Sequence, residues 1–169
     1  MPWRGAPLCQ EHGIVPIVEP EVLCSGDHDL SASARASALA LSALFDHLGQ
    51  AGVDLTGIVL KANFVTPGPA AAKVSAAEVA AATDQVLRDH VPATVAGIAF
   101  LSGGHPTEDA CAFLGALKDI SDRPWDIIFS FGRALVNSVL HTWAGSADRV
   151  LLAQQQLLDN CAQAAAAAR

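Results

Sequence analysis

The chain has 169 residues, of which 51% are apolar, which is enough for one domain with a sizeable core. Ten basic residues against seventeen acidic ones give a net charge of −7, and the basic residues stand singly. This balance argues against nucleic acid and anionic membrane surfaces as partners. Charges, Gly or Pro interrupt every long apolar run, so no stretch supplies the ~20 apolar residues of a membrane helix.

The cysteines are scattered along the chain and form no C-x-x-C pair. This spacing argues against a disulfide framework or a structural zinc site, and we expect reduced thiols that mostly serve in packing. The N-terminal residues also lack the apolar core of a signal peptide. We therefore expect a cytoplasmic protein. The four cysteines are Cys9, Cys24, Cys111 and Cys161.

Four apolar runs alternate with helical patterns along the chain. The runs cover residues 13–22, 57–63, 95–104 and 126–132. The helical patterns cover residues 31–50, 75–90, 106–118, 132–143 and 147–167. Because the runs are continuous rather than alternating, they predict parallel strands that are covered on both faces. The order predicts right-handed βαβ units, in either a doubly wound sheet or part of a (β/α)8 barrel, which takes ~250 residues when complete.

Start signals accompany three of the helical patterns. Ser31 and Ser75 are predicted N-caps, and Glu78 stands at the capping-box position after Ser75. Pro106 suits a first helical turn. The alanine-rich tail, residues 162–169, is helix-prone and is interpreted as a frayed helix end.

One lysine, Lys61, stands at the end of an apolar run and before a turn, in VLKANFVTPG. Such a lysine can extend its ammonium group out of the strand end into water. Alternatively, burial among apolar neighbours lowers the pKa of an amine below its free value of ~10.4, and the neutral amine can attack a carbonyl group to form a Schiff base. The local pattern leaves both interpretations open.

Two glutamates, Glu19 and Glu21, follow the first apolar run. Alternate residues of a strand point to the same side, and close like charges raise one pKa toward the range useful for proton transfer. A solvated strand end or a helix-capping role is the plainer alternative. The pair is therefore a candidate acid and base for forming and hydrolysing a carbinolamine.

A glycine-rich turn and an arginine follow the third and fourth runs. Ser102, Gly103 and Gly104 can present a hydroxyl and backbone N–H groups to an anion near a helix start, although such a triplet alone is usually just a turn. Arg133, after Gly132, can bind the same anion through two hydrogen bonds. Because the carboxyl ends of parallel strands form the active-site face, the polar ends of all four runs predict one site.

The stretch GDHDL, with Asp27, His28 and Asp29, raises the question of a metal. Three adjacent residues do not match the spaced histidine ligands of catalytic zinc sites, so a polar loop is the favoured interpretation. The other histidines form no i, i+4 pair and are expected at the surface or its boundary. They are His12, His47, His90, His105 and His141.

From about Cys9 to about Cys161, the chain resembles class I fructose-bisphosphate aldolase. The matching segments are, in order, GIVPIVEPEVL with SGDHDL, VLKANFVTPG, VAGIAFLSGG and FSFGRAL. The resemblance implies a (β/α)8 barrel, typically in a homo-oligomer. It also implies reversible cleavage of fructose 1,6-bisphosphate to dihydroxyacetone phosphate and glyceraldehyde 3-phosphate in glycolysis. The reaction runs through a lysine Schiff base without a metal or other cofactor.

The resemblance also implies roles for single residues. Lys61 matches the Schiff-base lysine, Glu19 the general acid/base carboxylate, and Glu21 the hydrogen-bonding neighbour of that carboxylate. The pocket for the phosphate on the ketose end is matched by Ser102, Gly103, Gly132 and Arg133. A transaldolase or another sugar-phosphate lyase would share the lysine chemistry and remains a minor alternative, and the aldehyde accepted stays open.

The chain departs from the family in several places. The family's first four strands would lie upstream of residue 1, and they carry an aspartate and lysines that assist C–C cleavage and hold the second phosphate. The segment Pro2-Trp3-Arg4 resembles part of the fourth strand with proline in place of lysine, by coincidence or as the scar of a deletion. Ala62 replaces a usual proline, and the family's C-terminal catalytic tyrosine is absent. We expect lower turnover.

We therefore expect residues 1–169 to form a single domain, the C-terminal half of an aldolase-type barrel with about four βα units and a C-terminal helix. Two functions stay open. The chain is an enzyme, or half of one, that still forms a Schiff base with dihydroxyacetone phosphate. Alternatively it is a non-catalytic half-barrel whose sheet edges and uncovered face pair with a second copy or aggregate.

Overall fold

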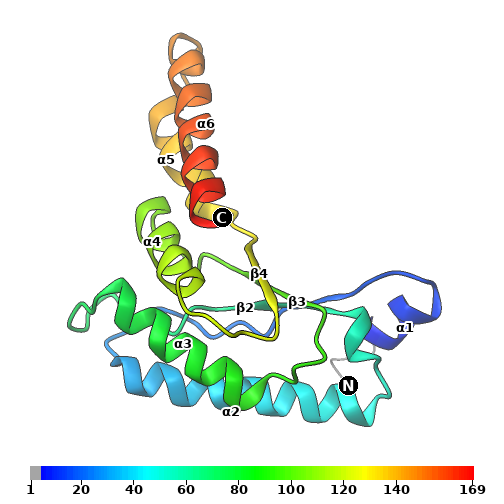
Figure 1. Cartoon of the computed structure of the whole chain (residues 1–169). Coiled ribbons are helices and arrows are strands. Elements are labelled where there is room, and N and C mark those ends of the chain that lie inside the picture. Colours follow the sequence, from blue (N-terminus) through cyan, green and yellow to red (C-terminus); the bar gives the residue numbers. More distant parts are fainter. Residues whose placement is uncertain (1–4) are drawn as a thin grey trace.

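The fold is known from a computed structural model that describes residues 5–169, and the segment Pro2-Trp3-Arg4 lies outside the described residues (Figure 1). The strands are β1 (Ile17–Val18), β2 (Val59–Ala62), β3 (Gly97–Phe100) and β4 (Asp126–Phe129). The helices are α1 (Gly5–Glu11), α2 (Leu30–Gln50), α3 (Ala76–His90), α4 (Thr107–Lys118), α5 (Arg133–Trp143) and α6 (Val150–Ala167). Short 3-10 helices span Leu55–Gly57 and Ala147–Arg149.

The strands form one parallel sheet in the order β1-β2-β3-β4, so the predicted succession of βα units is confirmed. Each strand is shorter than its apolar run, and β1 has only two residues. Prolines at positions 16 and 20 explain this short strand. Pro16 still accepts a hydrogen bond from the Val59 N–H at 3.1 Å, but Pro20 has no N–H with which to continue the ladder.

One face of the sheet carries the hydrophobic core. The register places Val18, Leu60, Ile98 and Ile127 side by side, and each is at most 6% exposed. Side chains of α2, α3 and α4 belong to the same core cluster. Within this core, the ring of Phe100 stacks on the ring of Phe64, with the ring centroids 4.5 Å apart.

The opposite face of the sheet is open at its two edge strands. Lys61, Ala99 and Ile128 are in register on this face, and Ile128 is 55% exposed. Ile17 on β1 is 63% exposed. The expectation of strands covered on both faces is therefore wrong for this chain. A continuous apolar run shows that both faces of a strand are apolar, but it does not show that other elements cover both of them. The expected uncovered face of a half-barrel is confirmed.

The helix starts test the predicted caps. Ser75 caps α3, and its capping box is complete, since its N–H donates to Glu78 at 2.8 Å and its hydroxyl accepts from the Glu78 N–H at 3.2 Å. The prediction for α2 is wrong. Asp29 is the N-cap, with Oδ1 accepting from the Ala32 N–H at 2.7 Å, while Ser31 lies inside the helix. Aspartate accepts this bond as well as serine does, so the preceding carboxylate takes the role.

We expect Asp29→Ala to destabilise the protein by ~1 kcal/mol, because an N-terminal N–H of α2 loses its acceptor. Ser31→Ala is the matched control, since the Ser31 hydroxyl accepts only an exposed bond from Arg35. That variant should stay within ~0.5 kcal/mol of wild type. Urea denaturation followed by circular dichroism measures both, and equal midpoints for the two variants would contradict the cap assignment.

The C-terminal tail is ordered as part of α6, so the interpretation as a frayed end is wrong. The helix runs to Ala167, and Ala164 is fully buried in the core cluster, where a residue larger than alanine would not fit without rearrangement. Figure 1 shows α5 and α6 as a hairpin that projects from the sheet and returns the C-terminus toward α4. Within residues 5–169, none of the helices has both the length and the apolar character of a membrane span.

Candidate active site

The polar residues predicted at the strand ends gather at the carboxyl edge of the sheet. Lys61 Nζ lies 2.9 Å from Glu19 Oε1. The side chain of Lys61 is 22% exposed and that of Glu19 is 41% exposed. The lysine is therefore sheltered but reachable, with a carboxylate in direct contact.

The strand register brings this pair together. Val18 is paired with Leu60, so the next residues along each chain, Glu19 and Lys61, face each other where β1 ends. Lys61 lies in register with Ala99 of β3. Because side chains alternate along a strand, Lys61 points to the open face while its neighbours Leu60 and Ala62 are buried.

The two glutamates contact different cations. Glu21 Oε1 lies 3.8 Å from Arg133 Nη2, whereas Glu19 contacts Lys61. Both glutamates lie beyond the end of β1 at Val18, so the strand alternation used to place them on one side does not apply to them. Each carboxylate therefore has a positive partner, and the contact between Glu21 and Arg133 is the longer of the two.

The glycine-rich turn and the start of α5 lie next to each other. Ser102 is buried, and its carbonyl accepts from the His105 N–H at 2.9 Å. Gly104 has a φ of +88°, and a Cβ there would lie 3.7 Å from Arg133 Nη1. Gly103 has a φ of +60°, so both glycines adopt backbone that other residues rarely take. The predicted anion-binding groups therefore lie close to one another, with Gly132 as the N-cap of α5.

The GDHDL loop, which follows β1, is hydrogen-bonded to the loop that follows β2. The carbonyl of His28 accepts from the Gly68 N–H at 2.9 Å, and the carbonyl of Gly26 accepts from the Ala70 N–H at 3.1 Å. A Cβ on Gly68 would lie only 2.3 Å from the Gly26 carbonyl oxygen, so the two loops require glycine at this contact. Within residues 5–169, no group of three or more His, Cys, Asp or Glu side chains is arranged to hold a metal.

The prediction that the cysteines mostly serve in packing is only partly right. All four are free thiols, but Cys161 is exposed and only Cys111 is fully buried. Cys24, in the β1–α2 loop, lies at the site, because a Cβ on Gly103 would come within 2.9 Å of its Sγ. Burial raises the pKa of the Cys24 thiol, so it remains protonated at neutral pH.

His105, expected at the surface boundary, is half-buried behind the glycine turn. Its Nε2 lies 3.1 Å from Thr66 Oγ1, and its ring meets Phe113 edge-to-face at 5.2 Å. Burial lowers the pKa of His105, so the imidazole is neutral at pH 7. It links the loop after β2 to the turn after β3. No short motif marks this contact, since Thr66 is 39 residues away in the chain.

We expect the free energy of unfolding to fall between pH ~7 and pH ~5.5 because of His105. The unfolded histidine takes up a proton near pH ~6.5, and the folded one only at lower pH. The unfolded state therefore binds more protons in this interval, and stability present above pH ~6.5 is lost as the pH falls through the folded pKa.

Urea denaturation at both pH values measures this effect, with His105→Gln as the comparison. Hydrogen bonds lower the pKa values of the Asp54 and Glu78 carboxyls, so in the folded state both titrate further below this interval than free carboxyls do. An equal loss of stability in wild type and variant would contradict the assignment to His105.

Comparisons with known proteins show the family of the chain. The family model "Fructose-bisphosphate aldolase class-I" matches residues 3–169. A fructose-bisphosphate aldolase of Drosophila melanogaster is 46% identical over 156 residues, which are 92% of this chain and 43% of the relative. The cytosolic fructose-bisphosphate aldolase 6 of Arabidopsis thaliana is 44% identical over 159 residues, which are 94% of this chain and 44% of the relative.

A solved structure gives the same result for the fold. The fructose-bisphosphate aldolase of Plasmodium falciparum, crystallised with TRAP and a small-molecule inhibitor, superposes with a TM-score of 0.89 at 39% identity. The match covers 96% of this chain and 47% of that one, so the chain spans a little under half the length of its relatives. The four βα units are thus part of a (β/α)8 barrel, and the chain belongs to the class I fructose-bisphosphate aldolase family.

Proposed function

We propose that these residues carry the Schiff-base half of a fructose-bisphosphate aldolase, with Lys61 as the nucleophile and Glu19 as the acid and base. The 2.9 Å contact between Lys61 Nζ and Glu19 Oε1 carries the proposal. A nucleophilic amine needs a nearby group that removes its proton, and a carboxylate at hydrogen-bond distance meets that need. A lysine that only extended into water would not require this partner at a sheltered strand end.

The reaction is proposed to begin with a proton transfer between the paired side chains. The ammonium group of Lys61 gives a proton to Glu19, and the neutral amine attacks the ketone carbon of dihydroxyacetone phosphate. The carbonyl oxygen takes up the proton that the nitrogen releases, which gives a carbinolamine. Glu19 then protonates the hydroxyl group, water leaves, and a protonated imine remains on Lys61.

The phosphate of the ketose is proposed to bind between the glycine turn and α5. Ser102, Gly103 and Gly104 supply hydroxyl and backbone N–H groups, and the N–H groups at the start of α5, after Gly132, face the same region. Arg133 is 62% exposed at its side chain, so its guanidinium reaches the solvent from which the anion arrives. Its contact with Glu21 at 3.8 Å is long enough for phosphate to replace it.

Trapping with borohydride tests this function. Wild type incubated with dihydroxyacetone phosphate and borohydride should gain one reduced adduct, detected by intact mass. Dihydroxyacetone without the phosphate should react ~10-fold or more slowly, because two or more charge-assisted hydrogen bonds are lost. Equal rates for the two ketones would refute the phosphate site, and no adduct with either would refute the Schiff-base function. Full cleavage of the sugar bisphosphate is proposed to need residues outside these 169.

A second candidate function is self-association of the half-barrel. Ile17 on one edge strand and Ile128 on the other are 63% and 55% exposed, and Leu23 beside the first edge is 73% exposed. Unpaired parallel edges with apolar side chains favour pairing with a second copy. Sedimentation velocity should then show a dimer or larger species, and a monomer at high protein concentration would contradict this candidate.

We also propose the cytoplasm as the site of action and a homo-oligomer as the working state. Relatives named as cytosolic isozymes in Arabidopsis thaliana support the first, as do four thiols that are all free. The exposed apolar edges support the second. The sugar phosphate is the proposed small-molecule partner.

A further inference from the structure

We propose that Asn63 is a positioning residue for the acid/base carboxylate. The proposal rests on the function assigned above to Glu19 and Lys61. It starts from the break in β1, because Pro20 cannot donate a ladder hydrogen bond and the strand ends at Val18. Without a further attachment, Glu19 would lie on a segment that is fixed at one end only.

The side chain of Asn63 supplies that attachment. Its Oδ1 accepts from the Val22 N–H at 2.9 Å, and its Nδ2 donates to the Val22 carbonyl at 3.0 Å. The carboxamide thus forms with Val22 the two bonds that a neighbouring strand would form with a backbone unit. Glu19 and Glu21 therefore lie in a short span held by the sheet at Val18 and by Asn63 at Val22.

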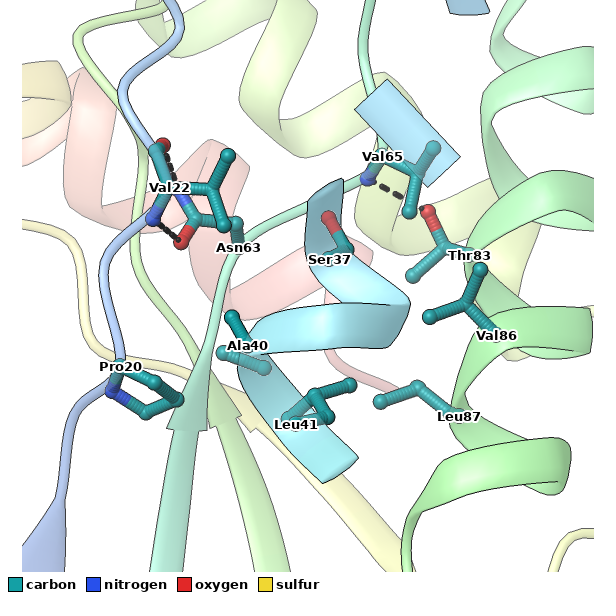
Figure 2. Close-up of a pocket in the computed structure, with 11 residues that line it drawn as sticks. Pro20, Val22, Ser37, Ala40, Leu41, Asn63, Val65, Thr83, Val86 and Leu87 are labelled. Carbon is teal, nitrogen blue, oxygen red and sulfur yellow. Dashed lines mark hydrogen bonds between the residues drawn. The ribbon is translucent and has the colours of Figure 1, made fainter. Parts of the chain in front are cut away.

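Hydrogen bonds supplement the packing of this span. A small cavity of about 10 Å³ separates Pro20 and Val22 from Ala40 and Leu41 of α2. Figure 2 shows the paired bonds between Asn63 and Val22, with the backbone of α2 on the other side of the cavity. The hydrogen bonds of Asn63 therefore act beside this pocket, where they fix the backbone of Val22.

The position of Asn63 in the chain makes this arrangement effective. It lies two residues after Lys61 and directly after the end of β2, so one short stretch of chain carries both the nucleophile and the group that fixes its carboxylate partner. Lys61 and Glu19 therefore keep their 2.9 Å contact although β1 ends at Val18, directly before Glu19. Asn63 contacts neither ketone nor phosphate in this scheme and acts only through Glu19.

The test compares Asn63→Leu, which keeps the branching and the number of side-chain heavy atoms but forms neither bond, with Thr83→Val. Thr83 is a matched control, because its hydroxyl accepts from the Val65 N–H at 2.9 Å beside the same cavity but does not bind the Glu19 segment. We expect Asn63→Leu to slow the maximal rate of borohydride trapping with dihydroxyacetone phosphate ~10-fold or more. The half-saturating ketone concentration should stay nearly unchanged. Thr83→Val, corrected for its folded fraction, should react at the wild-type rate.

A second readout does not depend on chemistry. Hydrogen exchange of the Val22 amide, followed by NMR, should accelerate ~10-fold or more in Asn63→Leu and not in Thr83→Val. Trapping at the wild-type rate, or an unchanged Val22 exchange rate, would overturn the proposal. If wild type itself formed no adduct, the proposed function would fail, and the Val22 exchange would decide alone whether Asn63 holds this segment.

Discussion

Lys61→Met is expected to abolish formation of the reduced adduct with dihydroxyacetone phosphate while the protein stays folded. No other amine in the described residues contacts Glu19, so trapping should fall below ~1% of the wild-type rate, in line with the ~10²–10⁴-fold effect of a positioned acid and base. Methionine has a similar length and is compatible with the open face of the sheet, where Ile128 is already exposed. Intact-mass spectrometry measures the adduct, and circular dichroism measures whether the variant is folded.

Lys73→Met provides the control, because Lys73 lies in the exposed loop before α3 and has no carboxylate partner among the salt bridges of residues 5–169. It removes one lysine but should leave the adduct yield unchanged. If Lys61→Met still formed the adduct at an appreciable fraction of the wild-type rate, another amine would be the nucleophile.

Phe100→Ala is expected to destabilise the protein by ~3–5 kcal/mol. Phe100 is completely buried, stacks on Phe64 at 4.5 Å with an interplanar angle of 11°, and Phe64 in turn meets Phe113 edge-to-face at 5.7 Å. The substitution leaves a cavity at the end of β3 and removes the stacked contact as well. Since domains are stable by only ~5–15 kcal/mol, this loss removes a large share of the total.

Leu151→Ala is the control for this substitution, because Leu151 in α6 is 79% exposed and its removal leaves no cavity. It should change the free energy of unfolding by less than ~0.5 kcal/mol. Urea denaturation followed by tryptophan fluorescence measures both variants. A Phe100→Ala midpoint near that of wild type would mean that the aromatic cluster does not form the centre of the core.

Much of the fold and of the site followed from local patterns. The alternation of apolar runs and helical stretches predicted the parallel βα order, and the Ser75 and Glu78 pair predicted the start of α3. The polar residues after each run predicted a single edge, and the structure brings Lys61 together with Glu19 there. These features depend on residues that lie close together in the chain, so they can be recognised from the sequence alone.

Other features depend on contacts between distant residues. Helix α1 was not predicted, and its Gln10 side chain is held by the backbone of Asp54, 44 residues later. The amide of Asn63 binds the backbone of Val22, 41 residues earlier, and a backbone partner leaves no trace in the sequence. Pro16 and Pro20 also indicate that β1 is short, because proline has no N–H to donate within a strand.

Peptide mapping of the trapped adduct identifies the amine that forms the imine. The chain has three lysines, Lys61, Lys73 and Lys118, and borohydride reduction in the presence of dihydroxyacetone phosphate marks whichever amine forms the imine. If the strand register and Glu19 activate one amine, essentially all of the adduct should lie on the peptide that contains Lys61. Adduct spread over the three lysines, or concentrated on the more exposed Lys73, would contradict the assignment of Lys61 as the nucleophile.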